Sequence, residues 1–222
     1  MPYKLSPSSL GLMKECPRCF WLRFNKGIKR PEAGFPTLPA GMDRILKTHF
    51  DSFRDRGQLP PELHELKGVK LFNDVELLEV WRNNFKGVQW TDKEGNLFRG
   101  AVDNILQKGK KLIVLDYKTR GYPLKEDTAG NYQDQLDIYN LLLRKNGYET
   151  EDYAYLLFYH PDKVDDDGDV IFNTDLMDRR ISVKNAERIF KEALDVLEGE
   201  MPEGGKECGF CEWVKATNIS GR

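Results

Sequence analysis

The stretch that decides the fold reads Gly100-Ala101-Val102-Asp103 and, a few residues on, Leu112-Ile113-Val114-Leu115-Asp116-Tyr117-Lys118. These letters belong to two apolar runs, 97–107 and 111–119, which the segment 108–110 joins as in a β-hairpin. Side chains alternate across a strand, so Asp116 and Lys118 are expected on one face. The hairpin would place Asp103 on the adjacent strand.

A charged trio at the end of buried strands is costly unless the charges are paired or bind a metal. Two carboxylates on neighbouring strands, Asp103 and Asp116, suit a hard divalent cation such as Mg²⁺ or Mn²⁺. A lysine two residues further on, Lys118, can orient an attacking water and offset charge on a phosphate. The alternative is a structural Asp–Lys ion pair.

The periodicity on either side of the hairpin predicts the rest of the fold. Helices are expected over 5–30, 42–56 and about 74–84, with a loop over 31–41. A short strand over 88–90 leads to the hairpin, and a helix over 131–146 follows it. Strands over 153–160 and 170–183 flank a tight turn at 165–169, and a helix covers 184–198. This order indicates an α/β fold with a central mixed sheet flanked by helices.

Composition places the chain among ordinary globular proteins. Its 222 residues are 40% hydrophobic, which is enough for one core, and a single domain over 1–222 is expected. Lys and Arg number 34 against 36 Asp and Glu, a balance that neither indicates nor excludes nucleic acid. No apolar run reaches the roughly 18 residues of a membrane span, and no secretory signal is present, which predicts a cytoplasmic protein without a membrane partner.

Three motifs in order, Gly100 to Asp103, Asp116 to Lys118, and Gln135 to Tyr139, resemble those of the PD-(D/E)XK nucleases. The closest branch is similar to the RecB-type exonucleases, including the CRISPR-associated exonuclease-like proteins. Ser6-Pro7-Ser8 and the following Cys-Pro-Arg segment also look like this branch, so the resemblance runs from about residue 5 to 213. It implies a restriction-endonuclease-like core and a metal-dependent deoxyribonuclease.

The resemblance assigns roles to the hairpin residues. Asp103 and Asp116 would hold Mg²⁺ or Mn²⁺, with the carbonyl of Tyr117 and a histidine, His49, as further ligands. Lys118 would position the attacking water. His49 lies on the apolar stripe of its helix (Met42, Ile45, Leu46, His49, Phe50, Phe53), where a hydrogen-bonded core histidine is the alternative.

Gln135 and Tyr139 lie four residues apart on a helix and share a face. In the resembled branch such a pair contacts DNA beside the active centre. The alternative is that Tyr139 is an ordinary core residue and Gln135 is solvated.

The four cysteines form two Cys-x-x-Cys pairs at opposite ends of the chain: Cys16, Cys19, Cys208 and Cys211. A reducing compartment argues against disulfides, and four thiolates suit one metal centre. Either Zn²⁺ or a [4Fe–4S] cluster, which relatives of this kind carry, is expected. The centre would join 1–30 and 200–222 as a clasp.

A basic aromatic stretch adjoins the first cysteine pair: Arg18, Phe20, Trp21, Arg23, Phe24, Lys26, Lys29 and Arg30. Such a stretch suits single-stranded DNA, or else a helix with its aromatic side chains in the core.

The expected function is therefore a nuclease, by resemblance an exonuclease on single-stranded DNA ends, in DNA repair, recombination or CRISPR adaptation with partner proteins of those systems. The first alternative is a catalytically silent DNA-binding or complex-assembly module with a structural zinc or iron–sulfur site. The second is a zinc or iron–sulfur protein with another task.

Overall fold

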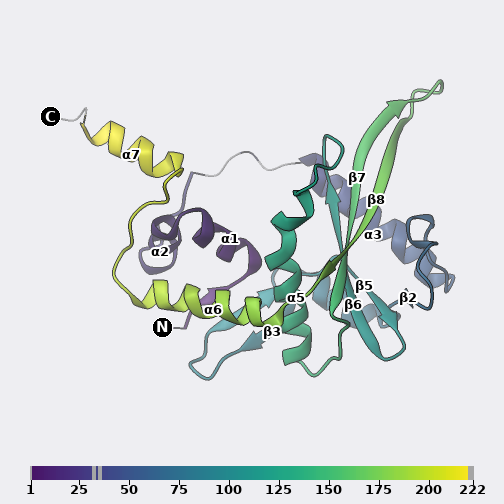
Figure 1. Cartoon of the computed structure of the whole chain (residues 1–222), viewed down its shortest axis with the longest axis horizontal. Coiled ribbons are helices and arrows are strands. Elements are labelled where there is room, and N and C mark those ends of the chain that lie inside the picture. The colour runs from purple at the N-terminus through teal and green to yellow at the C-terminus, as the bar shows by residue number, and fades with distance from the viewer. Residues whose placement is uncertain (1, 32–33, 35–36, 220–222) are drawn as a thin grey trace. The chain divides into compact units, whose positions relative to one another are not determined.

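The structure, a computed structural model, describes residues 2–31, 34 and 37–219 (Figure 1). The chain divides into two compact units. The terminal unit contains 1–34, 91–98 and 184–222, and the sheet unit contains 35–90 and 99–183. The segments predicted to form the clasp, 1–30 and 200–222, both belong to the terminal unit.

The elements follow one another in this order: β1 (Lys4–Leu5), α1 (Pro7–Glu15), α2 (Pro17–Asn25), α3 (Thr37–Asp55), the 3₁₀ helix η1 (Pro61–Leu63), β2 (Lys70–Leu71), α4 (Val75–Arg82), β3 (Val88–Thr91), β4 (Leu97–Gly100), β5 (Asn104–Lys108), β6 (Lys111–Thr119), the 3₁₀ helix η2 (Thr128–Tyr132), α5 (Gln133–Lys145), β7 (Tyr153–Val164), β8 (Val170–Arg180), α6 (Val183–Glu198) and α7 (Gly209–Ile219). None of these helices is both long and apolar enough to cross a membrane.

The sheet unit is built on a five-stranded sheet in the order β2-β5-β6-β7-β8. Strands β6 and β7 are parallel and are joined through α5, whereas the other neighbours are antiparallel. Figure 1 shows α5 on one side of this sheet and α3 on the other. The prediction of an α/β fold with a mixed, helix-flanked sheet is confirmed.

The central strand β6 is buried on both faces because helices cover both. Its residues 113, 115 and 117 pack in one cluster with Leu46 and Phe50 of α3. The alternate residues, including Asp116 and Lys118, therefore face the side of the sheet that carries α5. Fully burying one large apolar side chain contributes roughly 1.5–3 kcal/mol, so this cluster fixes the face on which the charges lie.

The strand predicted over 97–107 is broken. β4 ends at Gly100 and β5 begins at Asn104, so Asp103 lies in the connection rather than on a strand. The backbone of this connection is bonded to the end of α4: the Val102 amide donates to the Trp81 carbonyl, and the Arg82 guanidinium donates to the Asp103 carbonyl. These contacts replace the ladder bonds of a continuous strand.

Other boundaries also differ from the predictions. The helix expected over 5–30 is two helices, since Cys16, in extended conformation, ends α1 and caps α2. Helix α3 begins at Thr37, inside the predicted loop over 31–41, of which 32–33 and 35–36 lie outside the described residues. Ile45, placed in the apolar stripe, is 58% exposed. Helix α7 has no counterpart among the predicted elements.

In the terminal unit, segments from both ends of the chain pack together. Strand β1 pairs in parallel with β4, and the ring of Phe98 stacks on that of Phe190 in α6 at 4.6 Å. The carbonyl of Leu197 accepts hydrogen bonds from the Tyr3 hydroxyl and the Asn25 amide. The N-terminal residues thus hold the end of α6.

Candidate active site and cysteine centre

Asp116 and Lys118 lie on one face of β6, as the alternation of a strand requires. Lys118 Nζ is 2.5 Å from Asp116 Oδ2 and donates a hydrogen bond to Gln135 Oε1 on α5 at 3.0 Å. The Asp116 side chain is only 1% exposed, while that of Lys118 is 16% exposed. The lysine therefore connects the buried carboxylate to the edge of the site that solvent reaches.

Asp103 is held against β6 although it lies outside a strand. Its Oδ2 accepts a hydrogen bond from the Tyr117 amide at 2.9 Å, and its Oδ1 is 3.5 Å from Lys47 Nζ of α3. The side chain is 20% exposed. Asp103, Asp116 and Lys118, the three residues predicted to form the centre, are thus brought together, and two of them keep access to solvent.

A buried polar network supports the connection that carries Asp103. Arg82, whose guanidinium binds the Asp103 carbonyl, is held by the Asp51 carboxylate at 2.7 Å. Asp51 also pairs with Arg54, which donates to Asn104 Oδ1 at 2.5 Å. Charged groups buried in this way are stable only when their hydrogen bonds are made, and the network therefore fixes the backbone around Asp103.

Burial and the neighbouring carboxylate change the acidity of Asp116. Desolvation is the larger cause and the negative charge of Asp103 the next, and together they outweigh Lys118 and raise the pKa of Asp116 to about 7. Two carboxylates that repel each other in this way gain stability when a cation lies between them. A bound cation would favour the ionised form of Asp116 and so lower its pKa.

Gln135 and Tyr139 continue the chain of contacts from Lys118. The Gln135 amide, which accepts from Lys118, donates through Nε2 to the Tyr139 hydroxyl at 2.6 Å. A Cβ on Gly100 would lie 2.7 Å from the Tyr139 ring, which is closer than real side chains come. Only glycine leaves room for the ring at this position, so the Gly-x-x-Asp and Gln-x-x-x-Tyr segments of this chain are in direct contact.

His49 does not converge on the two aspartates. Its Nε2 lies 3.1 Å from Glu62 Oε1, and its ring packs edge-on against Phe50 and Phe53. Within the described ranges, the four cysteines are the only group of three or more His, Cys, Asp or Glu side chains whose ligand atoms all lie close together. The metal-ligand role of His49 stays a prediction.

The side chain of Tyr117 points away from the aspartates. Its hydroxyl accepts from Asn104 Nδ2 at 2.6 Å, and its ring packs against Phe50 at 4.8 Å. Any role in metal binding therefore belongs to its backbone carbonyl, as the sequence predicted, and this role too stays a prediction.

Two residues of α3 that sequence reasoning missed reach the site instead. Lys47 lies between two carboxylates, 2.8 Å from Asp43 and 3.5 Å from Asp103. The ammonium group thus occupies a position where two acidic side chains attract a cation. The spacing of Asp43 and Lys47, one helical turn apart, was the available signal, but it is also that of an ordinary surface ion pair.

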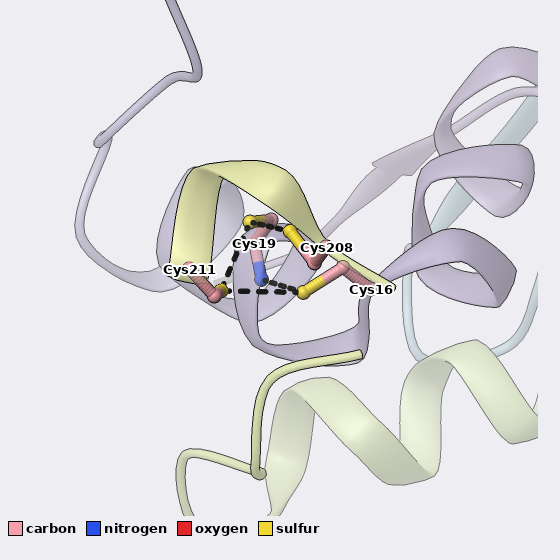
Figure 2. A group of neighbouring side chains, drawn as sticks. All are labelled: Cys16, Cys19, Cys208 and Cys211. Carbon is pink, nitrogen blue, oxygen red and sulfur yellow. Dashed lines mark hydrogen bonds between the residues drawn. The ribbon is translucent and has the colours of Figure 1, made fainter. Parts of the chain in front are cut away.

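The four cysteines form one compact centre in the terminal unit (Figure 2). Their sulfur atoms all lie within 4.8 Å of one another. Three sulfur pairs are closer: 3.7 Å for Cys16 and Cys211, 3.7 Å for Cys19 and Cys208, and 3.8 Å for Cys19 and Cys211. A tetrahedral ion with metal–sulfur bonds of about 2.3 Å needs sulfurs about 3.8 Å apart, which agrees with these values.

Each cysteine pair lies at the start of a helix. Cys16 caps α2, and Cys208 directly precedes α7, so the positive ends of both helix dipoles favour thiolates. Burial raises the pKa of Cys16, but hydrogen bonds from the amides of Gly205 and Cys19 outweigh it and lower the pKa to about 6. Arg30 donates to the Cys208 sulfur at 3.3 Å. Burial, together with the neighbouring sulfurs, instead raises the pKa of Cys19 and raises that of Cys211 to about 12, so these thiols need a bound cation to favour their thiolate forms.

A family model described as the PD-(D/E)XK nuclease superfamily matches residues 4–216. The chain therefore belongs to this superfamily, and the resemblance noted in the sequence is confirmed. A solved structure titled "Crystal structure of SSO0001" is similar over 97% of this chain and 85% of that chain, with 15% identity and a TM-score of 0.47. No curated protein matches the chain.

Proposed function

We propose that the protein is a metal-dependent deoxyribonuclease that hydrolyses phosphodiester bonds at Asp103, Asp116 and Lys118. The observation that carries this proposal is the buried Asp116 carboxylate, placed beside a second carboxylate and paired with a lysine that still reaches solvent. A structural ion pair between Asp116 and Lys118 would not need the second acid, whose charge opposes the ionisation of Asp116.

The donor set fits a hard divalent cation. Asp116 Oδ2 is buried and accepts no hydrogen bond of good geometry from the described residues, although Lys118 Nζ is close. Asp103 Oδ2 is bonded to the Tyr117 amide, which leaves Oδ1 to face the Lys47 ammonium at 3.5 Å. Each acid thus offers one oxygen to Mg²⁺ or Mn²⁺. A bound cation would polarise the phosphate and lower the pKa of an attacking water.

Lys118 has the position needed to act on the phosphate or the water. Gln135 and Asp116 fix its ammonium group on the face of β6 that carries Asp116. We assign Lys118 to orienting the water and offsetting the charge that develops on the phosphate. Gln135 is a positioning residue for Lys118, and Tyr139 holds Gln135. A silent binding module would have no use for this chain of contacts.

The finer function follows the RecB-type resemblance: exonuclease action on single-stranded DNA ends, in repair, recombination or CRISPR adaptation. The test uses end-labelled linear and covalently closed circular DNA, single- and double-stranded, with Mg²⁺ or Mn²⁺. We expect linear single strands to be degraded and closed circles to persist. Equal cleavage of circles would replace exonuclease with endonuclease.

Variants test the assignment of the centre. Asp116→Asn and Lys118→Ala should lower the cleavage rate about 100-fold or more, the usual loss when one charge-stabilising group is removed. Lys111→Ala is the matched control, since Lys111 lies at the other end of the same strand and forms a surface pair with Glu151. Cleavage that survives both site variants would overturn the proposal.

We further propose that the four cysteines hold a single Zn²⁺ rather than a [4Fe–4S] cluster. In a cluster, an iron lies between each thiolate and the centre, so the sulfurs stand further apart than around one ion. The sulfur separations of 3.7–3.8 Å match the spacing around a single tetrahedral ion, which supports zinc. One zinc per chain and a colourless protein are expected. Four irons with acid-labile sulfide and brown colour would overturn the assignment.

A further inference from the structure

We infer that the terminal unit carries a binding site for single-stranded DNA, in which the Trp213 indole stacks on a base beside the cysteine centre. The inference rests on the proposed function, which makes DNA the substrate. The site is a cavity of about 280 Å³ between the start of α2, residues 28–31 and α7. Its walls are Arg18, Cys19, Leu22, Ile28, Lys29, Arg30, Pro31, Phe210, Cys211, Trp213, Val214 and Lys215.

The charged side chains that line this cavity are all cationic, while Glu15 lies in the adjoining hollow beside Phe210 and Trp213. Arg18, Lys29 and Lys215 line it together with Arg30, and no carboxylate does so among the described residues. Arg30 is committed to structure, since it pairs with Glu15 at 2.6 Å and donates to a cysteine sulfur. The other three cations form no ion pair within the described part of the chain. They are available to phosphates, although the whole chain is nearly neutral.

The apolar part of the site is exposed in a way that a folded core does not explain. The Trp213 side chain is 68% exposed, Ile28 57% and Val214 47%. The Phe210 ring, beneath the Arg30 guanidinium at 4.8 Å, is 40% exposed. Exposed aromatic rings next to unpaired cations are the combination with which proteins bind single strands without sequence preference.

The basic aromatic stretch predicted to bind DNA provides cations to this site but no aromatic ring. Phe20 is fully buried, its ring packs against Phe24, and the Trp21 indole donates to the Gly199 carbonyl. Those rings hold the terminal unit together, as the alternative interpretation expected. The stacking surface comes instead from α7, and the cysteines bring it next to the cations of 18–30.

The size of the cavity also favours a base. Its volume of about 280 Å³ is near the lower end of small-molecule pockets, roughly 300–1,000 Å³, and suits a planar ring better than a folded peptide. Cys19 and Cys211 form part of its wall, so a metal held by the four cysteines would set the spacing between α2 and α7. The DNA site would then be assembled together with the metal site.

The test is equilibrium binding to the full-length, zinc-loaded Lys118→Ala protein, which should not cleave its ligand. Fluorescence anisotropy compares labelled oligothymidylate with an abasic strand of equal length. Trp213→Ala should weaken oligothymidylate binding about tenfold or more, since one stacked base is lost, and leave abasic binding unchanged. Trp213→Phe should restore most of the affinity. Phe85→Ala, which removes an 81% exposed ring of the sheet unit, is the matched control.

Charge is tested in the same assay. Lys29→Ala and Lys215→Ala should each reduce the slope of log K against log salt by about 0.7, the value for one phosphate contact to a single strand. Unchanged binding by Trp213→Ala would overturn the inference, even if the chain cleaves DNA. A change of oligomeric state in Trp213→Ala without loss of DNA binding would assign the surface to self-association and also overturn it. Binding that depends on Trp213 without cleavage by the unmodified chain would remove only the proposed nuclease activity.

Discussion

Replacing Gly100 by alanine should damage both stability and catalysis through one contact. The added Cβ would lie 2.7 and 2.8 Å from two ring carbons of Tyr139, whereas carbon atoms normally approach to about 3.5–4.0 Å. The ring must therefore move by roughly 0.8 Å. Because Tyr139 is 4% exposed, the ring cannot swing into solvent. Overpacking of this kind costs about 1–3 kcal/mol of unfolding free energy.

The displaced ring should also affect Lys118. Its hydroxyl is the group that holds Gln135 at 2.6 Å, and Gln135 in turn holds Lys118 at 3.0 Å. Urea unfolding followed by circular dichroism measures the first effect, and the rate of DNA cleavage measures the second. Gly41→Ala is the control, since nothing lies within 4 Å of its Cβ position and the residue is inside α3. It should be neutral or stabilising by up to about 1 kcal/mol.

A double-mutant cycle decides whether the ring is the cause. In the Tyr139→Leu background, Gly100→Ala should cost less than about 0.5 kcal/mol, because the clashing atoms are gone. An equal cost in both backgrounds would refute the reasoning and would place the strain elsewhere in the connection 101–103.

Three further predictions concern the site and the cysteine centre. Gln135→Leu should lower kcat about tenfold and leave the DNA dissociation constant within twofold, because it frees Lys118 without removing a phosphate contact. An equal loss of kcat and of DNA affinity would indicate that Gln135 binds DNA directly. Asp43→Asn should raise the Mg²⁺ or Mn²⁺ concentration needed for half-maximal cleavage more than His49→Ala does, since Asp43 is linked through Lys47 to Asp103 whereas His49 is paired with Glu62. The reverse order in a metal titration would favour His49 as a metal ligand. Removal of zinc by a chelator should lower the unfolding temperature in calorimetry and release one zinc per chain; an unchanged transition would contradict a structural centre.

Much of the sheet could be predicted because β6 carries its own signal. A run of four apolar residues followed by Asp116 and Lys118 indicates a buried strand with charges at its end, whatever surrounds it. The break before Asp103 could not be predicted in this way. It depends on Arg82 and Trp81 of a distant helix, and local propensity carries no information about their contacts.

The same limit explains the other differences. His49 fits an apolar stripe and a ligand equally well by spacing, and only the position of Glu62 shows where its ring nitrogen points. Helix α7 begins within the second cysteine pair, and Cys211 in its first turn lies beside Cys16 and Cys19 from the other end of the chain. The cysteine pairing itself was predictable because no cysteine lies elsewhere.

The terminal unit is built from three segments that lie far apart in the sequence, and this has a consequence for biosynthesis. Residues 99–183 complete the sheet unit, and all of them are synthesised before Cys208 is added to the chain. Cys16 and Cys19 must remain as a half-site with two ligands during most of translation. A chain released before residue 211 would therefore contain the whole sequence of the sheet unit, with Asp103 and Asp116, but could never close the clasp.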